Sequence, residues 1–172
     1  MTTFLLVRHG ETDWNAEGRL QGQTDRPLSH FGRQQARQLA EELEGEEFEA
    51  IYSSDLARAR ETAEIVSEQL GLTVALDPDL REKDWGTWEG LTGVERDRVE
   101  FVGESTEAHQ ERILGALRRI SERHRGDVSV LVITHGGSMR RVQTAAMGLA
   151  LPVVENCGRW LCVCEDGGFR AT

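Results

Sequence analysis

Two histidines and two arginines stand close behind apolar stretches of the sequence. Arg8 and His9 follow one short apolar run, His135 comes two residues after another, and Arg58 lies a few residues beyond a third. Arginine forks bind phosphate oxygens through paired, charge-assisted hydrogen bonds. A neutral imidazole has a free ring nitrogen that can attack phosphorus. This combination of residue types therefore predicts phosphoryl-group chemistry.

Hydrolysis of a phosphate ester needs further groups beside the nucleophile. A second histidine can donate hydrogen bonds to the phosphoryl oxygens as negative charge builds on them. The leaving alcohol needs an acid, and the attacking water later needs a base. Glu82, in the segment 80–86, is the best candidate for that acid and base.

Strands and helices are expected to alternate along the chain and so to position these groups. Short apolar stretches predict strands at 4–7, 48–52, 73–76, 128–133, 160–164 and 169–171. Helices are predicted at 30–44, 56–70, 106–123 and directly after the Gly136-Gly137 turn. Ser29 and Asp55 are the expected N-caps of the first two helices, and Gly71 is the expected stop of the second.

Two long stretches lack a clear pattern. Residues 10–28 are predicted to form a loop with at most one helical turn, and residues 77–105 to be irregular. Loops of that length inside a compact domain are usually functional.

The alternation predicts an α/β fold in a single domain, residues 1–172. We expect three layers, α/β/α, around a central and mostly parallel sheet. Ligands of such sheets bind beyond the carboxyl ends of the strands. Helix N-termini at the same edge favour anions. The histidines and arginines are thus expected to converge on one anion-binding edge.

The motifs that carry these residues occur in order along nearly the whole chain. They are Arg8-His9-Gly10-Glu11-Thr12, Trp14-Asn15, Gly18-Arg19-Leu20-Gln21-Gly22, Asp25, Pro27-Leu28-Ser29, Gly32, Ser53-Ser54-Asp55-Leu56-Ala57-Arg58, Thr62-Ala63, the Glu82 segment ending in Trp88-Glu89-Gly90, Gly103-Glu104-Ser105 and Thr134-His135-Gly136-Gly137. This series resembles the histidine phosphatase superfamily, in its phosphoglycerate mutase-like branch. A single Arg-His-Gly triplet would be weak evidence, whereas so many ordered motifs are strong evidence.

The resemblance implies a role for each matching catalytic residue. His9 would be the nucleophile that becomes phosphorylated. Arg8, Arg58 and His135 would hold the phosphoryl group, and Glu82 would be the proton donor. A phosphoglycerate mutase-like fold is implied as well.

The resemblance also implies the groups that bind the substrate. Asn15 and the Gly136 N–H would add hydrogen bonds to the phosphoryl group, and Gln21 and Gly22 would line the substrate side. No metal and no other cofactor is implied. We therefore expect a metal-independent phosphoric monoester hydrolase, similar to histidine acid phosphatases, that hydrolyses small-molecule phosphomonoesters through a phosphohistidine intermediate.

Composition narrows the possible partners. Thirty acidic and 20 basic residues give a net charge of −10, which repels a nucleic-acid backbone. Lys83 is the one lysine and stands in Glu-Lys-Asp, so a nucleotide-binding P-loop is excluded. No apolar run approaches the roughly 20 residues of a membrane span. With neither a membrane nor a signal segment in the sequence, we expect a cytoplasmic protein with a small phosphorylated substrate.

Two other phosphatase chemistries have partial signatures. Cys164 and Arg170 have the spacing of thiol phosphatases, but Glu165 and Asp166 lie between them and would repel phosphate. No helix can follow Arg170 to bind the anion, so this chemistry is rejected. The three cysteines are expected to be reduced thiols, with those in Trp160–Cys164 buried.

The segment Asp77-Pro78-Asp79 follows a weak strand, as in magnesium-dependent aspartyl phosphatases. Arg81 stands where such enzymes carry Thr or Val, and their other residues are missing. This chemistry is rejected too.

Three alternative functions remain at this stage. A cofactor-dependent phosphoglycerate mutase would normally carry longer segments that enclose the site, whereas residues 91–103 form only a short cover. A short cover favours access of water and hence hydrolysis. A protein phosphohistidine phosphatase is a further alternative. A phosphate-binding module without turnover is disfavoured, because it would need the arginines but not His9, His135 and Glu82.

Other charged and aromatic residues receive simpler interpretations. Arg60, Arg140 and Arg141 are predicted to be solvated, and Glu11 is expected to orient a site group rather than to cap the loop. No role is expected for three further histidines: His30, His109 and His124. Trp85 and Trp88 are expected either to pack their loop or to form a wall of the pocket.

Overall fold

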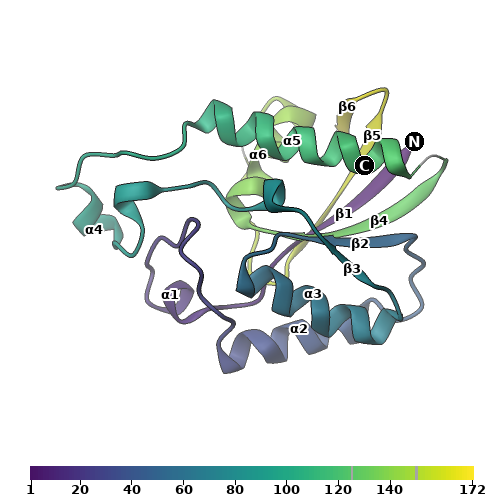
Figure 1. Ribbon diagram of the computed structural model, residues 1–172, viewed down its shortest axis with the longest axis horizontal. Helices are drawn as coiled ribbons and strands as arrows, with labels where there is room; N and C mark the ends of the chain where they lie inside the picture. The colour runs from purple at the N-terminus through teal and green to yellow at the C-terminus, as the bar shows by residue number, and fades with distance from the viewer. Residues whose placement is uncertain (125, 150) are drawn as a thin grey trace.

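Strands and helices alternate along most of the chain in the computed structural model, which describes residues 1–124, 126–149 and 151–172 (Figure 1). The strands are β1 (Thr2–Arg8), β2 (Ala50–Ser53), β3 (Val74–Leu76), β4 (Val128–Thr134), β5 (Arg159–Glu165) and β6 (Gly168–Ala171). The helices are α1 (Asp13–Ala16), α2 (His30–Glu42), α3 (Ala57–Leu70), α4 (Gly93–Arg96), α5 (Thr106–Arg123) and α6 (Gly136–Met147). Two single 3₁₀ turns, η1 (Pro78–Leu80) and η2 (Gly86–Trp88), lie between β3 and α4.

The strands form one sheet in the order β3-β2-β4-β1-β5-β6. β1 pairs in parallel with β4 over its whole length, and β2 is parallel to both β3 and β4. The last two strands are antiparallel to their neighbours. The predicted mostly parallel sheet is therefore confirmed, with an antiparallel C-terminal edge.

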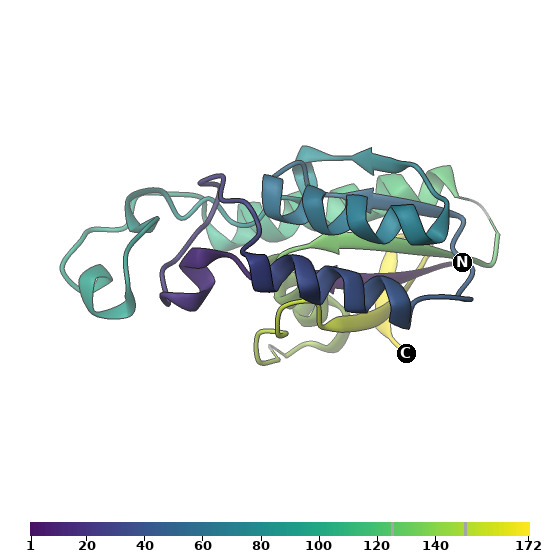
Figure 2. The ribbon, with the colours of Figure 1, turned by 90° about the horizontal axis from the view of Figure 1, so that it is seen from below.

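Helices cover both faces of this sheet, which confirms the three predicted layers. α5 and α6 lie on one side of the sheet in Figure 1, and α2 and α3 on the other. Seen from below, α2 and α3 run side by side across their face (Figure 2). The two termini of the chain lie together at the end of the sheet remote from α1 and α4.

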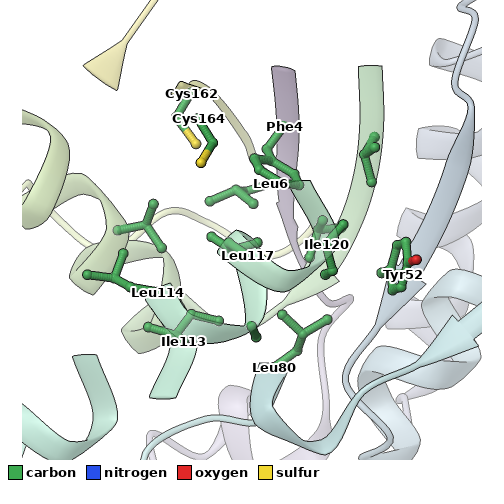
Figure 3. Close-up of a cluster of buried hydrophobic side chains, with 14 of the residues drawn as sticks. Phe4, Leu6, Tyr52, Leu80, Ile113, Leu114, Leu117, Ile120, Cys162 and Cys164 are labelled. Carbon is green, nitrogen blue, oxygen red and sulfur yellow. The ribbon is translucent and has the colours of Figure 1, made fainter. Parts of the chain in front are cut away.

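Alternation along β1 connects the two faces. Phe4 and Leu6 pack with Leu117 and Ile120 of α5 in one buried cluster (Figure 3). Leu5, the neighbour of both, packs into the cluster beneath α2 and α3. Burying a side chain of this size contributes roughly 1.5–3 kcal/mol. Both faces of the central strands are thus anchored, which fixes where their carboxyl ends lie.

Local signals place most helix ends as predicted. Ser29 caps α2, because its Oγ accepts a hydrogen bond from the Gly32 N–H at 2.9 Å. Gly71 ends α3 in the left-handed conformation, with φ at +67°. The expected cap of α3 is wrong: Leu56 is the N-cap and has no capping side-chain bond. Asp55 instead pairs with Arg81, which draws its carboxylate away from the helix end.

The predicted Gly136-Gly137 turn is also placed differently. Both glycines belong to the first turn of α6, and His135 is its N-cap. The helix therefore begins directly behind β4, and its N-terminal N–H groups lie at the edge of the sheet.

The two irregular stretches gather at one end of the molecule, where α1 and α4 lie in Figures 1 and 2. The second stretch is folded on itself. Trp88 donates from Nε1 to the Val99 carbonyl at 2.8 Å, and its ring lies 4.8 Å from that of Phe101. Residues 77–105 thus form an ordered flap with three short helical turns.

The described residues contain no helix that is both long and apolar enough to cross a membrane. The three cysteines are free thiols, and Cys162 and Cys164 are buried, as predicted.

Candidate active site

A cavity of about 320 Å³ lies at the carboxyl ends of β1 and β4. Of the predicted site residues, those that line it are Arg8, His9, Asn15, Gln21, Gly22, Arg58, Glu82 and Gly136. The predicted residue outside this lining, His135, is fully buried behind it, and its ring centroid lies 5.1 Å from that of His9. The structure therefore brings the whole predicted set to one place.

His9 follows directly after β1, and among the described residues only one of its two ring nitrogens contacts a backbone group. Its Nδ1 lies 2.6 Å from the Gly10 carbonyl, an acceptor that requires the hydrogen on Nδ1. The lone pair is then on Nε2. Burial lowers the pKa of His9 well below its ordinary value, and the charges of Arg58 and Arg8 lower it further. At neutral pH His9 is therefore an uncharged imidazole with a nucleophilic Nε2.

His135 presents a hydrogen-bond donor that lacks a partner. Its Nε2 lies 2.9 Å from Ser54 Oγ, and Ser54 Oγ accepts from the Leu56 N–H at 3.3 Å. The Ser54 hydroxyl hydrogen can then point at Nε2, which leaves the hydrogen of His135 on Nδ1. This Nδ1 is buried without a partner among the described residues. Burial and the nearby Arg58 charge also lower the pKa of His135 well below its ordinary value.

Arg8, which is partly buried, and Arg58, which is buried, supply positive charge. Arg58 is 1% exposed and donates to the carbonyls of Gly22 and Thr24, at 2.6 and 3.1 Å. Arg8 donates to the Val154 carbonyl at 2.8 Å. Within residues 1–124, 126–149 and 151–172 neither guanidinium forms an ion pair, and each has a buried Nε without a partner.

Burial lowers the pKa of both guanidiniums, that of Arg58 to about 10. Both therefore stay charged at neutral pH. Buried charge without a counter-ion is costly, so this arrangement favours a bound anion.

Thr62 links the end of β1 to α3. Its Oγ1 accepts from the Gly10 N–H at 3.1 Å and donates to the Arg58 carbonyl at 2.7 Å. One buried hydroxyl thus ties the backbone beside His9 to the backbone of Arg58.

Glu82 lies against the first turn of α6. Its Oε2 accepts from the Gly137 N–H at 2.9 Å, and its Oε1 accepts from the Lys83 N–H at 2.8 Å. A Cβ at position 137 would overlap the Glu82 carboxylate, so this close approach requires glycine. The carboxylate is thereby fixed at the rim of the cavity.

Arg112 of α5 holds the backbone that carries Glu82, a role that the sequence analysis did not assign. It donates to the carbonyls of Asp79, Arg81 and Glu82 at 2.9, 3.0 and 3.1 Å. It also binds both carboxylate oxygens of Glu104 at 2.9 Å. In the sequence, Arg112 is one of several arginines in the helix that follows Gly103-Glu104-Ser105. Its position in that helix does not show which backbone carbonyls it binds.

Thr12 forms hydrogen bonds with two polar residues that line the cavity, Gln21 and Asn15. Its Oγ1 donates to Gln21 Oε1 at 2.7 Å, and its N–H donates to Asn15 Oδ1 at 3.1 Å. The Asn15 NH₂ is then the part of that amide available to an anion. Gly22 serves Arg58 through its carbonyl, and its φ of +56° and contact with Glu89 leave no room for a side chain.

Four residues occupy positions that differ from those predicted from the sequence. Arg140 and Arg141, predicted to be solvated, line the cavity. His109, for which no role was expected, is 2% exposed, lines the cavity and lies 3.8 Å from Glu82. The Glu11 carboxylate accepts from Oγ of Ser29, the N-cap of α2, at 3.0 Å, so the expectation that it orients a site group is wrong.

The remaining residues take simple places. Arg60 is exposed, as predicted, and pairs with Glu64. Trp85 lines the cavity while Trp88 packs the flap, so each of the two expected roles occurs once. In the described part of the chain, no group of three or more His, Cys, Asp or Glu side chains is arranged to hold a metal ion.

The chain is similar to known phosphatases and phosphoglycerate mutase-like proteins. The family model described as the histidine phosphatase superfamily (branch 1) matches residues 4–170. "Phosphoglycerate mutase-like protein 4" of Arabidopsis thaliana is 39% identical over 162 residues, which cover 83% of this chain and 70% of that protein. "Metal-independent phosphoserine phosphatase" of the same plant is 37% identical over 161 residues, which cover 83% and 67%.

Solved structures agree in fold over the whole chain. Bacillus stearothermophilus YhfR superposes with a TM-score of 0.91 at 34% identity, covering 100% of this chain and 96% of its own. The phosphoserine phosphatase of Entamoeba histolytica, in an H9A variant with bound phosphoserine, gives a TM-score of 0.86 at 27% identity and covers 100% and 95%.

Proposed function

The chain belongs to the histidine phosphatase superfamily (branch 1), and on that premise we propose that it hydrolyses small phosphomonoesters through a phosphorylated His9. The observation that carries the proposal is the environment of His9. An uncharged imidazole with a free Nε2 lies near the buried Arg58 and the partly buried Arg8. Among the described residues, neither guanidinium has a counter-ion, and the buried His135 N–H has no partner. These groups match a phosphoryl anion facing a nucleophile.

The first step transfers the phosphoryl group to the enzyme. The Nε2 lone pair of His9 forms a bond to phosphorus while the bond from phosphorus to the ester oxygen breaks. Glu82 gives the leaving oxygen a proton, so the alcohol departs neutral. Arg8, Arg58 and His135 stabilise the charge on the phosphoryl oxygens, and the Gly10 carbonyl stabilises the positive charge that develops on the His9 ring.

Two uncharged donors add hydrogen bonds to the phosphoryl group. The Asn15 NH₂ and the Gly136 N–H face the same cavity, and Gly136 lies in the first turn of α6, where free N–H groups favour anions.

The second step returns the enzyme to its starting state. Glu82, now a carboxylate, takes a proton from water, and the water oxygen forms a bond to phosphorus as the bond to Nε2 breaks. Phosphate leaves, His9 is again a neutral imidazole and Glu82 again carries the proton. The positive charge this chemistry needs comes from the fixed guanidiniums, so the proposed reaction is metal-independent.

The flap supports hydrolysis over transfer to a second substrate. Residues 91–103 fold back onto η2, and in the described structure they contribute nothing to the lining of the cavity. Water therefore has access to a phosphorylated His9. A cavity of about 320 Å³ suits a small molecule better than a protein segment. Mutase activity and a phosphoprotein substrate remain the alternatives that an experiment must separate.

The test is phosphate release from a panel of phosphomonoesters with a chelator present. Wild-type protein is compared with His9→Ala and with Arg60→Gln, which removes an exposed charge that does not line the cavity. Chelator-resistant release that is lost only in His9→Ala supports the proposal. Release that requires a divalent cation, or interconversion of 2- and 3-phosphoglycerate in a coupled assay without net hydrolysis, contradicts it.

A further inference from the structure

Three basic side chains that line the cavity take no part in the proposed phosphoryl chemistry. They are Lys83, the one lysine of the sequence, and Arg140 and Arg141 of α6. Lys83 is only 8% exposed, and the two arginines are partly buried. They form a second positively charged group in a cavity of a protein whose net charge is −10.

None of the three is neutralised by a carboxylate. Among the described residues, Lys83, Arg140 and Arg141 form no ion pair. Another arginine of the same cavity, Arg19, is by contrast paired with Glu17 at 2.7 Å and Glu95 at 3.7 Å. The Arg140 Nε is buried without a partner. The cations are therefore free to pair with an anion that enters the cavity.

Lys83 is held in place by contacts that leave most of its donors free. Its Nζ donates to Thr106 Oγ1 at 3.2 Å and lies 4.5 Å from the Trp85 ring centroid and 5.1 Å from that of Phe101. An ammonium has three N–H donors, of which this hydrogen bond uses one. Thr106 is the first residue of α5, so the N-terminus of that helix adds positive potential at the same point.

The order of groups along α6 locates these cations relative to the reaction. Gly136 lies at the phosphoryl end, the Gly137 N–H holds the Glu82 carboxylate, and Arg140 follows one helical turn after Gly136. Four residues of helix rise about 6 Å. Glu82 protonates the leaving oxygen in the proposed mechanism, and its carboxylate is bonded to the backbone of Lys83 and of Gly137, the latter three residues before Arg140. The cations are therefore assigned to the leaving-group side.

We propose that the substrate is a small phosphomonoester whose alcohol carries a second anionic group, bound by Lys83, Arg140 and Arg141. This inference rests on the proposed function, because it uses Glu82 to define the leaving-group side. A carboxylate or a second phosphate has the chemistry that these donors bind. A phosphomonoester of the same size with an uncharged alcohol would leave the three cations without a counter-ion.

The test compares substrates that differ only in the second anion. O-Phosphoserine is paired with O-phosphoethanolamine, which lacks the carboxylate, and 3-phosphoglycerate is paired with glycerol 3-phosphate. Fructose 1,6-bisphosphate is compared with fructose 1-phosphate and fructose 6-phosphate to detect a preference for a second phosphate. We expect kcat/KM to favour the member that carries the second anionic group, in at least one set, by roughly tenfold or more. The set that shows this preference identifies the anion.

Variants assign the preference to the named residues. We expect Lys83→Gln and the double variant Arg140→Gln/Arg141→Gln to reduce the ratio of the two kcat/KM values toward one. Arg60→Gln removes one exposed arginine and should keep the wild-type ratio. A ratio that is unchanged in both test variants would overturn the assignment.

The outcomes separate this inference from the proposed function. Turnover of both members of every set at equal rates would sustain the phosphatase and overturn the second anion site. If no ester is hydrolysed, the proposed function fails, and calorimetric binding of the same pairs to His9→Ala decides on the site. Tighter binding of the anionic member would then support it, and equal binding would overturn it.

Discussion

The two ends of the cavity are built in different ways. At the phosphoryl end, Arg8 and His9 extend a central strand, and His135 follows its neighbour in the sheet, so their positions are fixed by strand pairing on both sides. At the leaving-group end, Lys83 and Trp85 lie in an irregular flap, while Arg140 and Arg141 come from a helix. The first end is a property of the sheet, and the second depends on side-chain contacts between segments.

The difference separates chemistry from selectivity. Groups at the phosphoryl end are buried or partly buried and bonded to backbone, as Arg58 is to Gly22 and Thr24, so they are already in place for any phosphoryl group. Groups at the other end have unused donors and are placed to choose among leaving groups. A damaged phosphoryl end should therefore abolish turnover, whereas a damaged leaving-group end should change rates by smaller factors.

The largest effect is expected from loss of the nucleophile. His9→Ala removes the Nε2 that forms the covalent intermediate, and we expect kcat to fall by roughly 10⁴-fold or more on every ester. Phosphate release under saturating substrate measures it, with Arg60→Gln as the control. Substantial residual turnover would mean that the phosphohistidine route is wrong.

Loss of the proton donor should have the next largest effect. Glu82→Gln keeps the size of the side chain but cannot donate the proton, and we expect kcat to fall by roughly 10²–10⁴-fold. Binding of inorganic phosphate, followed by calorimetry, should persist because Arg8, Arg58 and His135 are untouched. An unchanged kcat would reassign the acid, with Asp84 as the nearest other acidic residue in the sequence.

The same contrast explains which parts of the structure could be predicted from the sequence alone. The strands at both sides of the site and the residues that follow them were predictable, because a buried strand needs a run of apolar residues and its end is marked where the run stops. Ser29 and Gly71 were predictable because capping acts over a few residues.

What depended on distant contacts could not be predicted. Arg140 resembled a solvated residue because the adjacent sequence does not show that the flap and α5 line the same cavity as Arg140. Asp55 resembled a helix cap because its partner Arg81 lies 26 residues away. The prediction for Glu11 was wrong for the same reason, since the Ser29 hydroxyl that it binds lies 18 residues away, at the start of α2.

A positioning residue between the two ends should give an intermediate effect. Arg112→Met removes three hydrogen bonds to the backbone of 79–82, so Glu82 loses part of its support. We expect kcat to fall by about 10- to 100-fold, since small misplacements have effects of this size. Binding of inorganic phosphate at the other end should change little.

Two further measurements distinguish positioning from general destabilisation by Arg112→Met. Arg112→Lys keeps the charge and should recover part of kcat, and the free energy of unfolding in urea shows whether the fold itself is weakened. A loss of phosphate binding equal to the loss of kcat would contradict a role directed at Glu82.

The smallest expected effect concerns stability against acid. The folded-state pKa values of His9 and His135 are lowered by burial, so these rings stay neutral in the fold while they bind protons in the unfolded chain. Stability is therefore greatest above the unfolded pKa of about 6.5 and is lost as pH falls below it. Between pH 7.5 and 5.5, two such histidines should lower the free energy of unfolding by about 2–3 kcal/mol.

Urea unfolding at several pH values measures this loss, and a variant isolates its source. His9→Ala removes one of the two rings and should reduce the loss by about half, whereas His30→Gln, at an exposed position, should keep the wild-type slope. Inorganic phosphate should raise stability in wild type, because it binds only the folded phosphoryl end. If His9→Ala and wild type lose stability in parallel as pH falls, the His9 ring is not held neutral by the fold, and the phosphoryl end lacks the ready nucleophile that sets it apart from the leaving-group end.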